Sequence, residues 1–319
     1  MKLSGSPRTT NVDNEAIDRL ISIINTGTAI LFTGAGFSDG AENALKQSPP
    51  IAKKLANLIS RLAGIEKDND LSYVSDYYLT YNSKSDLLDL LKQHFTILST
   101  KPYHRTISSK SWKRIYTTNY DDCIEKSALA SKKIIYSLTA DDNPMEFYKK
   151  KNCCIHLNGS IVSVSENDLD TKFKLTRTSY VSPDSFVNSP WYYYFKKDLE
   201  QSSAIVFIGY SLYDVDIEKL LFSSPILKKK TYFIIGNAPS KKEVYILSKY
   251  GFVLPIGVDG FAAKIESSYL PTQKISEFWL DCFEKYQISH TRSSISDDEI
   301  LTFILHGELR KEHIDNSIS

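Results

Sequence analysis

The chain has 319 residues, enough to bury a sizeable core in one large α/β domain with an insertion or in two modest domains. Its 39 Lys and Arg residues nearly balance 38 Asp and Glu residues, so composition offers no basic field for nucleic acid or an anionic membrane surface. No apolar run approaches the roughly 20 residues of a membrane span, and the N-terminus lacks the apolar segment of a signal peptide. We expect a cytoplasmic protein without direct nucleic-acid or membrane binding.

The elements in chain order follow an α/β rhythm. Ile17, Leu20, Ile21 and Ile24 recur at helical spacing and predict an amphipathic helix over 13–25. Strand-sized apolar runs follow at 29–33, 114–117, 133–138, 153–157, 204–208, 231–235 and 252–256. Their continuous hydrophobicity and the helical stretches between several of them predict a Rossmann-like, doubly wound, mainly parallel sheet.

Three segments depart from this rhythm. Several amphipathic helices are expected in an insertion at about 41–100, where it would cap the site. Residues 1–12 are expected to form a flexible leader, and 13–285 a single nucleotide-binding domain. Beyond it, 286–319 form a C-terminal extension that could lead into a further domain, although an ordinary ragged terminus is equally compatible with this composition.

The four cysteines give no sign of a metal centre. Cys123, Cys153, Cys154 and Cys282 contain no C-x-x-C pair, so neither a zinc ribbon nor a redox motif is present. Cys153 and Cys154 are adjacent on an expected strand, where neighbouring side chains face opposite ways and could not share one ion. We expect buried, reduced thiols and no bound metal.

The first apolar strand runs directly into a glycine-rich turn, Gly34-Ala35-Gly36-Phe37-Ser38. Glycine lets a backbone turn tightly and approach an anion, and a helix following such a turn would direct its N–H groups at a phosphate. The next glycine is Gly40, so the spacing departs from Gly-x-Gly-x-x-Gly. The turn is therefore either a dinucleotide-binding turn or an ordinary strand-to-helix connection.

Small and polar residues also follow the later strands, at the sheet edge where ligands of doubly wound folds bind. Asn119 and Asp121 follow the 114–117 run; Asn119 could hold a ribose or a water. His156 lies on the next buried strand beside Asn158-Gly159 and could titrate near neutral pH. Each of these residues could instead be present only because it favours a turn, and His156 could be a buried histidine whose hydrogen bonds are made within the core. The remaining strand ends carry Gly209-Tyr-Ser211 and Gly236-Asn237.

Together these motifs resemble the sirtuins, and more closely the sirtuin-like NAD-consuming effectors of bacterial antiphage defence that lack the zinc ribbon. The resemblance covers most of 13–285, and its motifs occur in family order: Gly34 to Ser38, Thr117-Thr118-Asn119-Tyr120-Asp121, His156-Leu-Asn-Gly159, Gly209-Tyr-Ser211 and Gly236-Asn237.

The resemblance implies a role for each motif. The Gly34-Ala35-Gly36-Phe37-Ser38 turn would wrap the NAD pyrophosphate, Asn119 would position the nicotinamide ribose or water, and Asp121 would meet the nicotinamide amide. His156 would be the general base, although sirtuins place their histidine immediately before the glycine, where this chain has Asn158. Asn158 is expected to contact the nucleotide, and Gly209, Ser211 and Asn237 to line its adenosine ribose end.

The resemblance also implies a reaction. Without the zinc module that borders the acyl-lysine channel, water is the expected acceptor, and the expected enzyme is an NAD+ glycohydrolase that depletes NAD+ during infection. NAD+ is its expected substrate. The alternatives are an NAD-dependent deacylase or ADP-ribosyltransferase, and a non-catalytic NAD or ADP-ribose sensor. Because unrestrained NAD+ loss would harm the host, we expect a homo-oligomer gated by an activating partner or a fused sensor domain.

Overall fold

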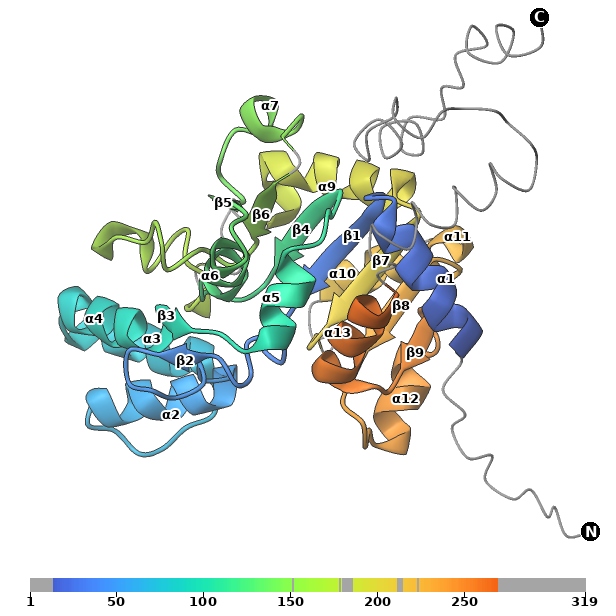
Figure 1. Ribbon diagram of the computed structural model, residues 1–319. Helices are drawn as coiled ribbons and strands as arrows, with labels where there is room; N and C mark the ends of the chain where they lie inside the picture. Colours follow the sequence, from blue (N-terminus) through green and yellow to red (C-terminus); the bar gives the residue numbers. More distant parts are fainter. Residues whose placement is uncertain are drawn as a thin grey trace, which may run out of the picture. The chain divides into compact units, whose positions relative to one another are not determined.

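A seven-stranded parallel sheet forms the centre of the computed structural model, which describes residues 14–150, 152–177, 179, 186–210, 215–222 and 224–268 (Figure 1). Every neighbouring pair is parallel, which confirms the predicted architecture. In spatial order the strands are β5 (Tyr136–Thr139), β6 (Cys153–His156), β4 (Arg114–Thr117), β1 (Ala29–Thr33), β7 (Ala204–Ile208), β8 (Thr231–Ile234) and β9 (Phe252–Leu254).

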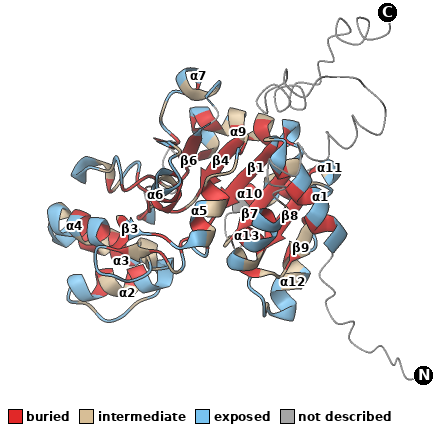
Figure 2. Cartoon of the chain, in the orientation of Figure 1, coloured by how far each residue is buried: buried red, intermediate tan, exposed pale blue. Residues whose placement is uncertain are grey.

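The chain reverses direction across the sheet at β1. It fills one side with β4, β6 and β5, and then crosses over to add β7, β8 and β9 on the other. All five residues of β1 and all five of β7 are buried, as their unbroken apolar sequences predicted (Figure 2). In open α/β sheets this reversal creates a crevice at the carboxyl ends of the strands.

Helices cover both faces of the sheet. The helices of one face bury their apolar stripes in a shared core with β1, β4 and β7: α1 (Asn14–Asn25), α5 (Pro102–Ser108), α6 (Cys123–Ala130) and α13 (Gly257–Ser267). The helices of the other face pack on a second core: α9 (Pro190–Gln201), α10 (Val215–Phe222), α11 (Pro225–Lys228) and α12 (Lys241–Leu247). Cys154 belongs to the first core and Cys153 to the second, so the adjacent thiols do face opposite ways.

The segment between β1 and β4 contains helices with a core of their own, as predicted for residues 41–100. These are α2 (Ala52–Leu62), α3 (Leu71–Tyr81) and α4 (Lys84–Phe95). Leu55, Val74, Leu87 and Leu91 are buried in this third core. Two short antiparallel strands that the sequence did not predict, β2 (Glu42–Asn43) and β3 (Ile97–Ser99), flank these helices. We call α2, α3 and α4 the helical module.

A buried ion pair fastens the amino end of β4. Arg114 is 3% exposed, and its Nε lies 3.3 Å from Oδ2 of the fully buried Asp198 on α9. The guanidinium also donates to the carbonyls of Tyr148 and Lys150, at 2.6 and 2.7 Å, just beyond the short helix α7 (Pro144–Phe147). The Tyr116 hydroxyl donates to the same Asp198 oxygen at 2.8 Å, so one buried carboxylate serves several partners.

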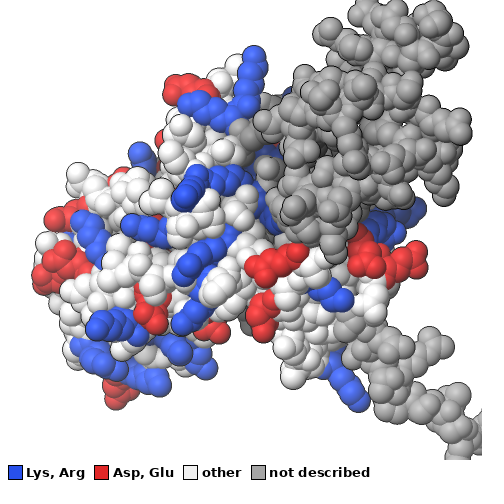
Figure 3. All heavy atoms as spheres, in the orientation of Figure 1, with Lys and Arg blue, Asp and Glu red and all other residues white. Residues whose placement is uncertain are grey.

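The remaining described elements are two 3-10 turns, η1 (Glu166–Asp168) and η2 (Phe186–Asn188). None of the described helices has the length and apolar character needed to cross a membrane. Basic and acidic side chains are interspersed on the face in Figure 3, in keeping with the formal net charge of +1. The expected leader at 1–12 and the extension at 286–319 lie outside the described residues, and the predicted domain boundaries stay predictions.

Candidate active site

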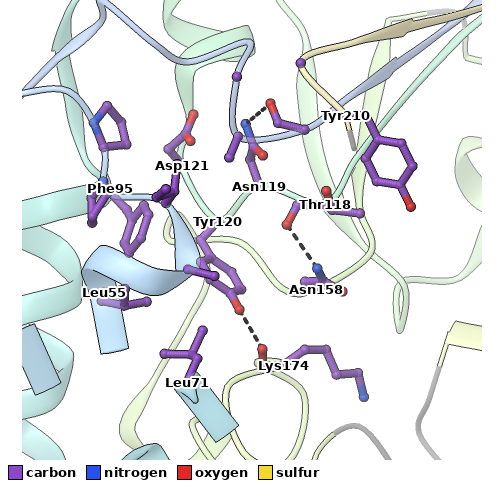
Figure 4. Close-up of a pocket in the computed structure, with 18 of the residues that line it drawn as sticks. Leu55, Leu71, Phe95, Thr118, Asn119, Tyr120, Asp121, Asn158, Lys174 and Tyr210 are labelled. Carbon is purple, nitrogen blue, oxygen red and sulfur yellow. Dashed lines mark hydrogen bonds between the residues drawn. The ribbon is translucent and has the colours of Figure 1, made fainter. Parts of the chain in front are cut away.

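A cavity of about 870 Å³ opens at the carboxyl ends of β1, β4, β6 and β7 (Figure 4). Seven residues predicted to form the site line it: Gly34, Ala35, Gly36, Asn119, Asp121, Asn158 and Gly209. The helical module completes the wall with apolar side chains, among them Leu55, Leu71 and Phe95. The volume of the cavity lies within the roughly 300–1,000 Å³ range of small-molecule sites.

The glycine turn packs its backbone directly against the loop that follows β7. The Gly34 and Gly36 amides donate to the carbonyls of Ile208 and Gly209, each at 3.0 Å. A Cβ on Gly36 would lie 2.8 Å from the Gly209 Cα, and Gly209 itself has φ +61°. Only glycines allow two backbones to approach so closely, which accounts for their presence independently of any phosphate.

The expected helix after this turn is absent. The chain from Ala35 to Gly40 forms turns and a bend, β2 follows, and the next helix, α2, begins only at Ala52. The helix dipole anticipated at the phosphate therefore does not exist at this position. His104 of α5 supports the turn instead, with its Nε2 2.7 Å from the Phe37 carbonyl oxygen.

Asn119 is held rigidly at the cavity wall. Its Nδ2 donates to the Gly34 carbonyl and to Ser38 Oγ, each at 3.0 Å, and so uses both of its hydrogens. Its backbone N–H donates to Thr117 Oγ1 at 3.0 Å, which fixes the turn beyond β4. The side-chain Oδ1 makes no hydrogen bond to a described residue, so the site presents a fixed acceptor at the cavity wall.

Asp121 is the second polar group of this wall, and one of its two carboxylate oxygens is already occupied. Oδ1 accepts from Ser38 Oγ at 2.8 Å and from the Cys123 N–H at 3.1 Å. Oδ2 makes no hydrogen bond within the described part of the chain. Burial raises the pKa of Asp121 to about 6, although the Ser38 and Cys123 hydrogen bonds and His156 act in the opposite direction.

His156 does not line the cavity. Its ring is 1% exposed, and both nitrogens have partners: Nδ1 lies 2.9 Å from the Asn119 carbonyl and Nε2 lies 2.9 Å from Glu125 Oε1. Because a carbonyl only accepts, Nδ1 must donate to Asn119. Burial is the largest single effect and opposes the charged imidazolium, but Glu125, the Asn119 carbonyl and the Asp121 carboxylate together outweigh it, so the pKa of His156 is raised.

The end of β6 explains why His156 and Asn158 do not face the same cleft. Side chains two apart share a face only while the backbone stays extended. The strand ends at His156, Leu157 and Asn158 form a turn, and Gly159 has φ +93°. Asn158 reaches the cavity, with its Nδ2 donating to the Thr118 carbonyl at 3.1 Å, whereas His156 stays beneath Asn119.

Glu125, Cys154 and His156 form a buried group of potential metal ligands, whose ligand atoms lie within 4.8 Å of one another. Two ligands of a tetrahedral zinc ion, each about 2.0–2.2 Å from the metal, would be separated by roughly 3.3 Å. The 2.9 Å contact between His156 and Glu125 is closer and matches a charge-assisted hydrogen bond. The geometry therefore favours an ion pair over a ligand pair at this position.

The other predicted nucleotide contacts lie elsewhere. Phe37 and Ser38 are buried and do not line the cavity; Ser38 acts through its hydrogen bonds to Asn119 and Asp121. Asn237 is exposed beyond β8 and outside the cavity lining. Ser211 lies outside the described residues. The cavity thus contains the residues expected at the ribose and nicotinamide end of the site. Of the two described residues expected at the adenosine end, Gly209 lines the cavity and Asn237 does not.

Sequence reasoning missed several lining residues. Tyr120 stacks on Phe173 at 4.4 Å between ring centroids and donates its hydroxyl to the Lys174 carbonyl at 2.5 Å. Lys174 is 4% exposed, and its Nζ donates to the Ser179 carbonyl at 2.8 Å. Tyr120 could have been predicted as a lining residue, because it lies between two predicted site residues in the sequence. No sequence signal marks Lys174.

A family model described as "SIR2-like domain" matches residues 113–254. Among curated proteins, "NAD(+) hydrolase ThsA" of Enterococcus faecium is 28% identical over 218 residues, which cover 64% of this chain and 41% of that protein. "Defense-associated sirtuin 2" of Bacillus subtilis is 26% identical over 254 residues, covering 74% of this chain and 23% of that protein. The chain therefore spans less than half the length of these relatives.

A solved structure from work on the "Mechanism and Regulation of Sir2 Enzymes" also matches. Its TM-score is 0.42 at 13% sequence identity, and the match covers 79% of this chain and 98% of that one.

Proposed function

We propose that this chain, which carries a SIR2-like domain, binds NAD+ in the cavity and hydrolyses it to nicotinamide and ADP-ribose. The observation that carries the proposal is the placement of Asn119, whose Nδ2 is fully engaged while its Oδ1 makes no hydrogen bond to a described residue. The names of the ThsA relatives support the same chemistry.

The chain's own groups suit the demands of this reaction. The backbones of Gly34, Ala35, Gly36 and Gly209 would face the pyrophosphate, and Asn119 Oδ1 would accept a hydrogen bond from a ribose hydroxyl or the attacking water. Cleavage of the bond between the ribose and nicotinamide leaves positive charge on the ribose. A fixed oxygen dipole and the Asp121 carboxylate at the cavity wall would stabilise that charge without reorganising.

The biological role belongs to the same proposal. The relative named "Defense-associated sirtuin 2" supports NAD+ depletion in antiphage defence. We place this activity in the cytoplasm, in a homo-oligomer. Because unrestrained turnover would exhaust the NAD+ of the host, a partner or a fused sensor domain would gate it. Full turnover by dilute monomer, unchanged on assembly, would contradict the gating.

A non-catalytic NAD+ or ADP-ribose sensor is the second candidate. The observation that favours it is the absence of any histidine among the described lining residues, since His156 is buried beneath Asn119. The two candidates differ in products: a sensor binds NAD+ saturably and leaves it intact. Deacylase or transferase activity would instead require an acyl-lysine or protein acceptor.

The test is the Asn119→Ala variant, which removes the fixed acceptor. Loss of a preorganised electrostatic group typically costs about 10²–10³-fold in kcat. We expect nicotinamide release to fall by that factor while the thermal unfolding midpoint changes little. Asn57→Ala, on α2 and outside the cavity lining, is the matched control and should retain full turnover. Near-wild-type turnover by folded Asn119→Ala would refute the assignment.

A further inference from the structure

The proton acceptor of the proposed reaction must be a group that reaches the cavity. Among the described lining residues, the titratable side chains are Asp121, Lys53, Lys174, Tyr120 and Tyr210. Lysine and tyrosine carry their protons at neutral pH and cannot accept another. Among the described lining residues, Asp121 is therefore the group that can take a proton from water.

Its geometry suits that role. Ser38 Oγ and the Cys123 N–H fix Oδ1 of Asp121 at 2.8 and 3.1 Å, which sets the orientation of the carboxylate. Oδ2 makes no hydrogen bond to a described residue. Asn119 shares the Ser38 hydroxyl at 3.0 Å, so the two polar groups of the wall are joined through one serine.

The competing base is held in place by two hydrogen bonds. To accept a proton from water, His156 would have to give up its hydrogen bond to the Asn119 carbonyl or to Glu125, and it is not among the residues that line the cavity. The existing contacts instead support the backbone of Asn119 from beneath. His156 and Glu125 thus act as positioning residues for the turn.

We propose that Asp121 is the general base of NAD+ hydrolysis in this chain, with His156 and Glu125 positioning the Asn119 turn. This inference rests on the proposed NAD+ hydrolysis. The bond between C1′ and the nicotinamide nitrogen breaks, and its electron pair leaves with nicotinamide. A water oxygen then bonds to C1′ of the oxocarbenium-like ribose, and its proton passes to Asp121 Oδ2 and from there to solvent. The products are nicotinamide, ADP-ribose and one proton.

The electrostatic surroundings are consistent with this role. Burial raises the pKa of Asp121 to about 6, close to the working pH that general bases require. The neighbouring groups pull in both directions: Ser38, the Cys123 N–H and His156 favour the ionised form, and the Asp122 carboxylate opposes it. Since the base must be ionised, kcat should fall below about pH 6.

The experiment compares full-length wild type with Asp121→Asn, measuring nicotinamide release, NAD+ affinity by calorimetry and thermal unfolding. Removing a general base typically lowers the rate by ~10²–10⁴-fold. We expect that loss in kcat with less than about a threefold change in Kd. Asp122→Asn is the matched control: Asp122 is equally buried, accepts from the Ile97 N–H at 2.8 Å and does not line the cavity. It should retain turnover.

Azide distinguishes a general base from a structural carboxylate. Unlike water, this anion can attack C1′ without losing a proton, so its attack needs no base. Asp121→Ala with sodium azide should recover nicotinamide release and form ADP-ribosyl azide. If Asp121→Asn does not fold, Ser38→Ala tests the same point. That substitution removes a donor to the ionised carboxylate and should shift the acidic limb of the kcat profile to higher pH.

The outcomes are separable. Turnover by wild type together with turnover by Asp121→Asn overturns the base assignment and leaves NAD+ hydrolysis standing. Loss of NAD+ affinity in Asp121→Asn, absence of azide rescue, or an unshifted acidic limb in Ser38→Ala likewise overturns it. Wild type that binds NAD+ but never releases nicotinamide refutes the proposed function itself, and the base assignment with it.

Discussion

Acid should weaken this fold through His104, the buried histidine that supports the glycine turn. Its Nε2 lies 2.7 Å from the Phe37 carbonyl, which can only accept, and its Nδ1 lies 3.1 Å from the Lys101 N–H, which can only donate. Both contacts require the neutral imidazole with its proton on Nε2. Burial lowers the pKa of His104 from 6.5 to about 4.

The direction and the size of this loss of folding stability follow from proton linkage. The folded-state pKa is lower than the unfolded value, so the stabilisation is fully present above about pH 6.5 and is lost as pH falls toward 4. A shift of roughly 2.5 units corresponds to about 3 kcal/mol in total, of which about 2 kcal/mol disappears between pH 7 and pH 5. His104 is fully buried, so solvent screening does not reduce this figure appreciably.

The assay is urea unfolding of wild type and His104→Gln at pH 7 and pH 5. Glutamine does not titrate, and other ionisable groups contribute almost equally to both proteins, so they cancel in the comparison. We expect the wild type to lose about 2 kcal/mol more than the variant between the two pH values. An identical pH dependence in both proteins would refute the neutral, buried state of His104.

Two further substitutions test the packing that builds the site. Gly209→Ala should lower the free energy of unfolding by more than the ~1–2 kcal/mol cost of a left-handed residue and abolish NAD+ binding, because its Cβ would lie 2.2 Å from the Phe37 amide nitrogen. Gly64→Ala, at φ +68° with open space around it, is the control for backbone cost alone, and equal losses in both would contradict the account. Arg114→Met should cost about 3–5 kcal/mol in urea unfolding, because it removes the buried guanidinium partner of the Asp198 carboxylate and leaves it the Tyr116 hydroxyl and the more distant Lys113. A loss under about 1 kcal/mol would show that Asp198 does not depend on this partner.

The sheet could be predicted because its strands are buried on both faces. Unbroken apolar runs such as 29–33 and 204–208 identify such strands by composition alone, and both have the predicted bounds. The helical module was recognisable for a similar reason, since Leu55 and Ile59 lie one helical turn apart on a buried face. The strands β2 and β3 are too short to leave a periodic signal.

The site was predictable only in part, because contacts between loops decide it. The sequence places Asn119 and Asp121 at a strand end, but the partners that orient them, Gly34 and Ser38, come from more than eighty residues away. The resemblance implied that His156 and Asn158 would both reach the nucleotide. The backbone turns after His156 and separates them, a change that no spacing rule records.

The most direct test of NAD+ hydrolysis by this chain is product analysis of purified protein incubated with NAD+ over a concentration series, with and without an acetylated peptide. If the chain hydrolyses NAD+, equal amounts of nicotinamide and ADP-ribose form without peptide, and both are lost in Asn119→Ala. Saturable NAD+ binding without any product, even at concentrations where the oligomer forms, would contradict NAD+ hydrolysis as the function of this chain. Product that forms only with peptide, as O-acyl-ADP-ribose, would contradict it too.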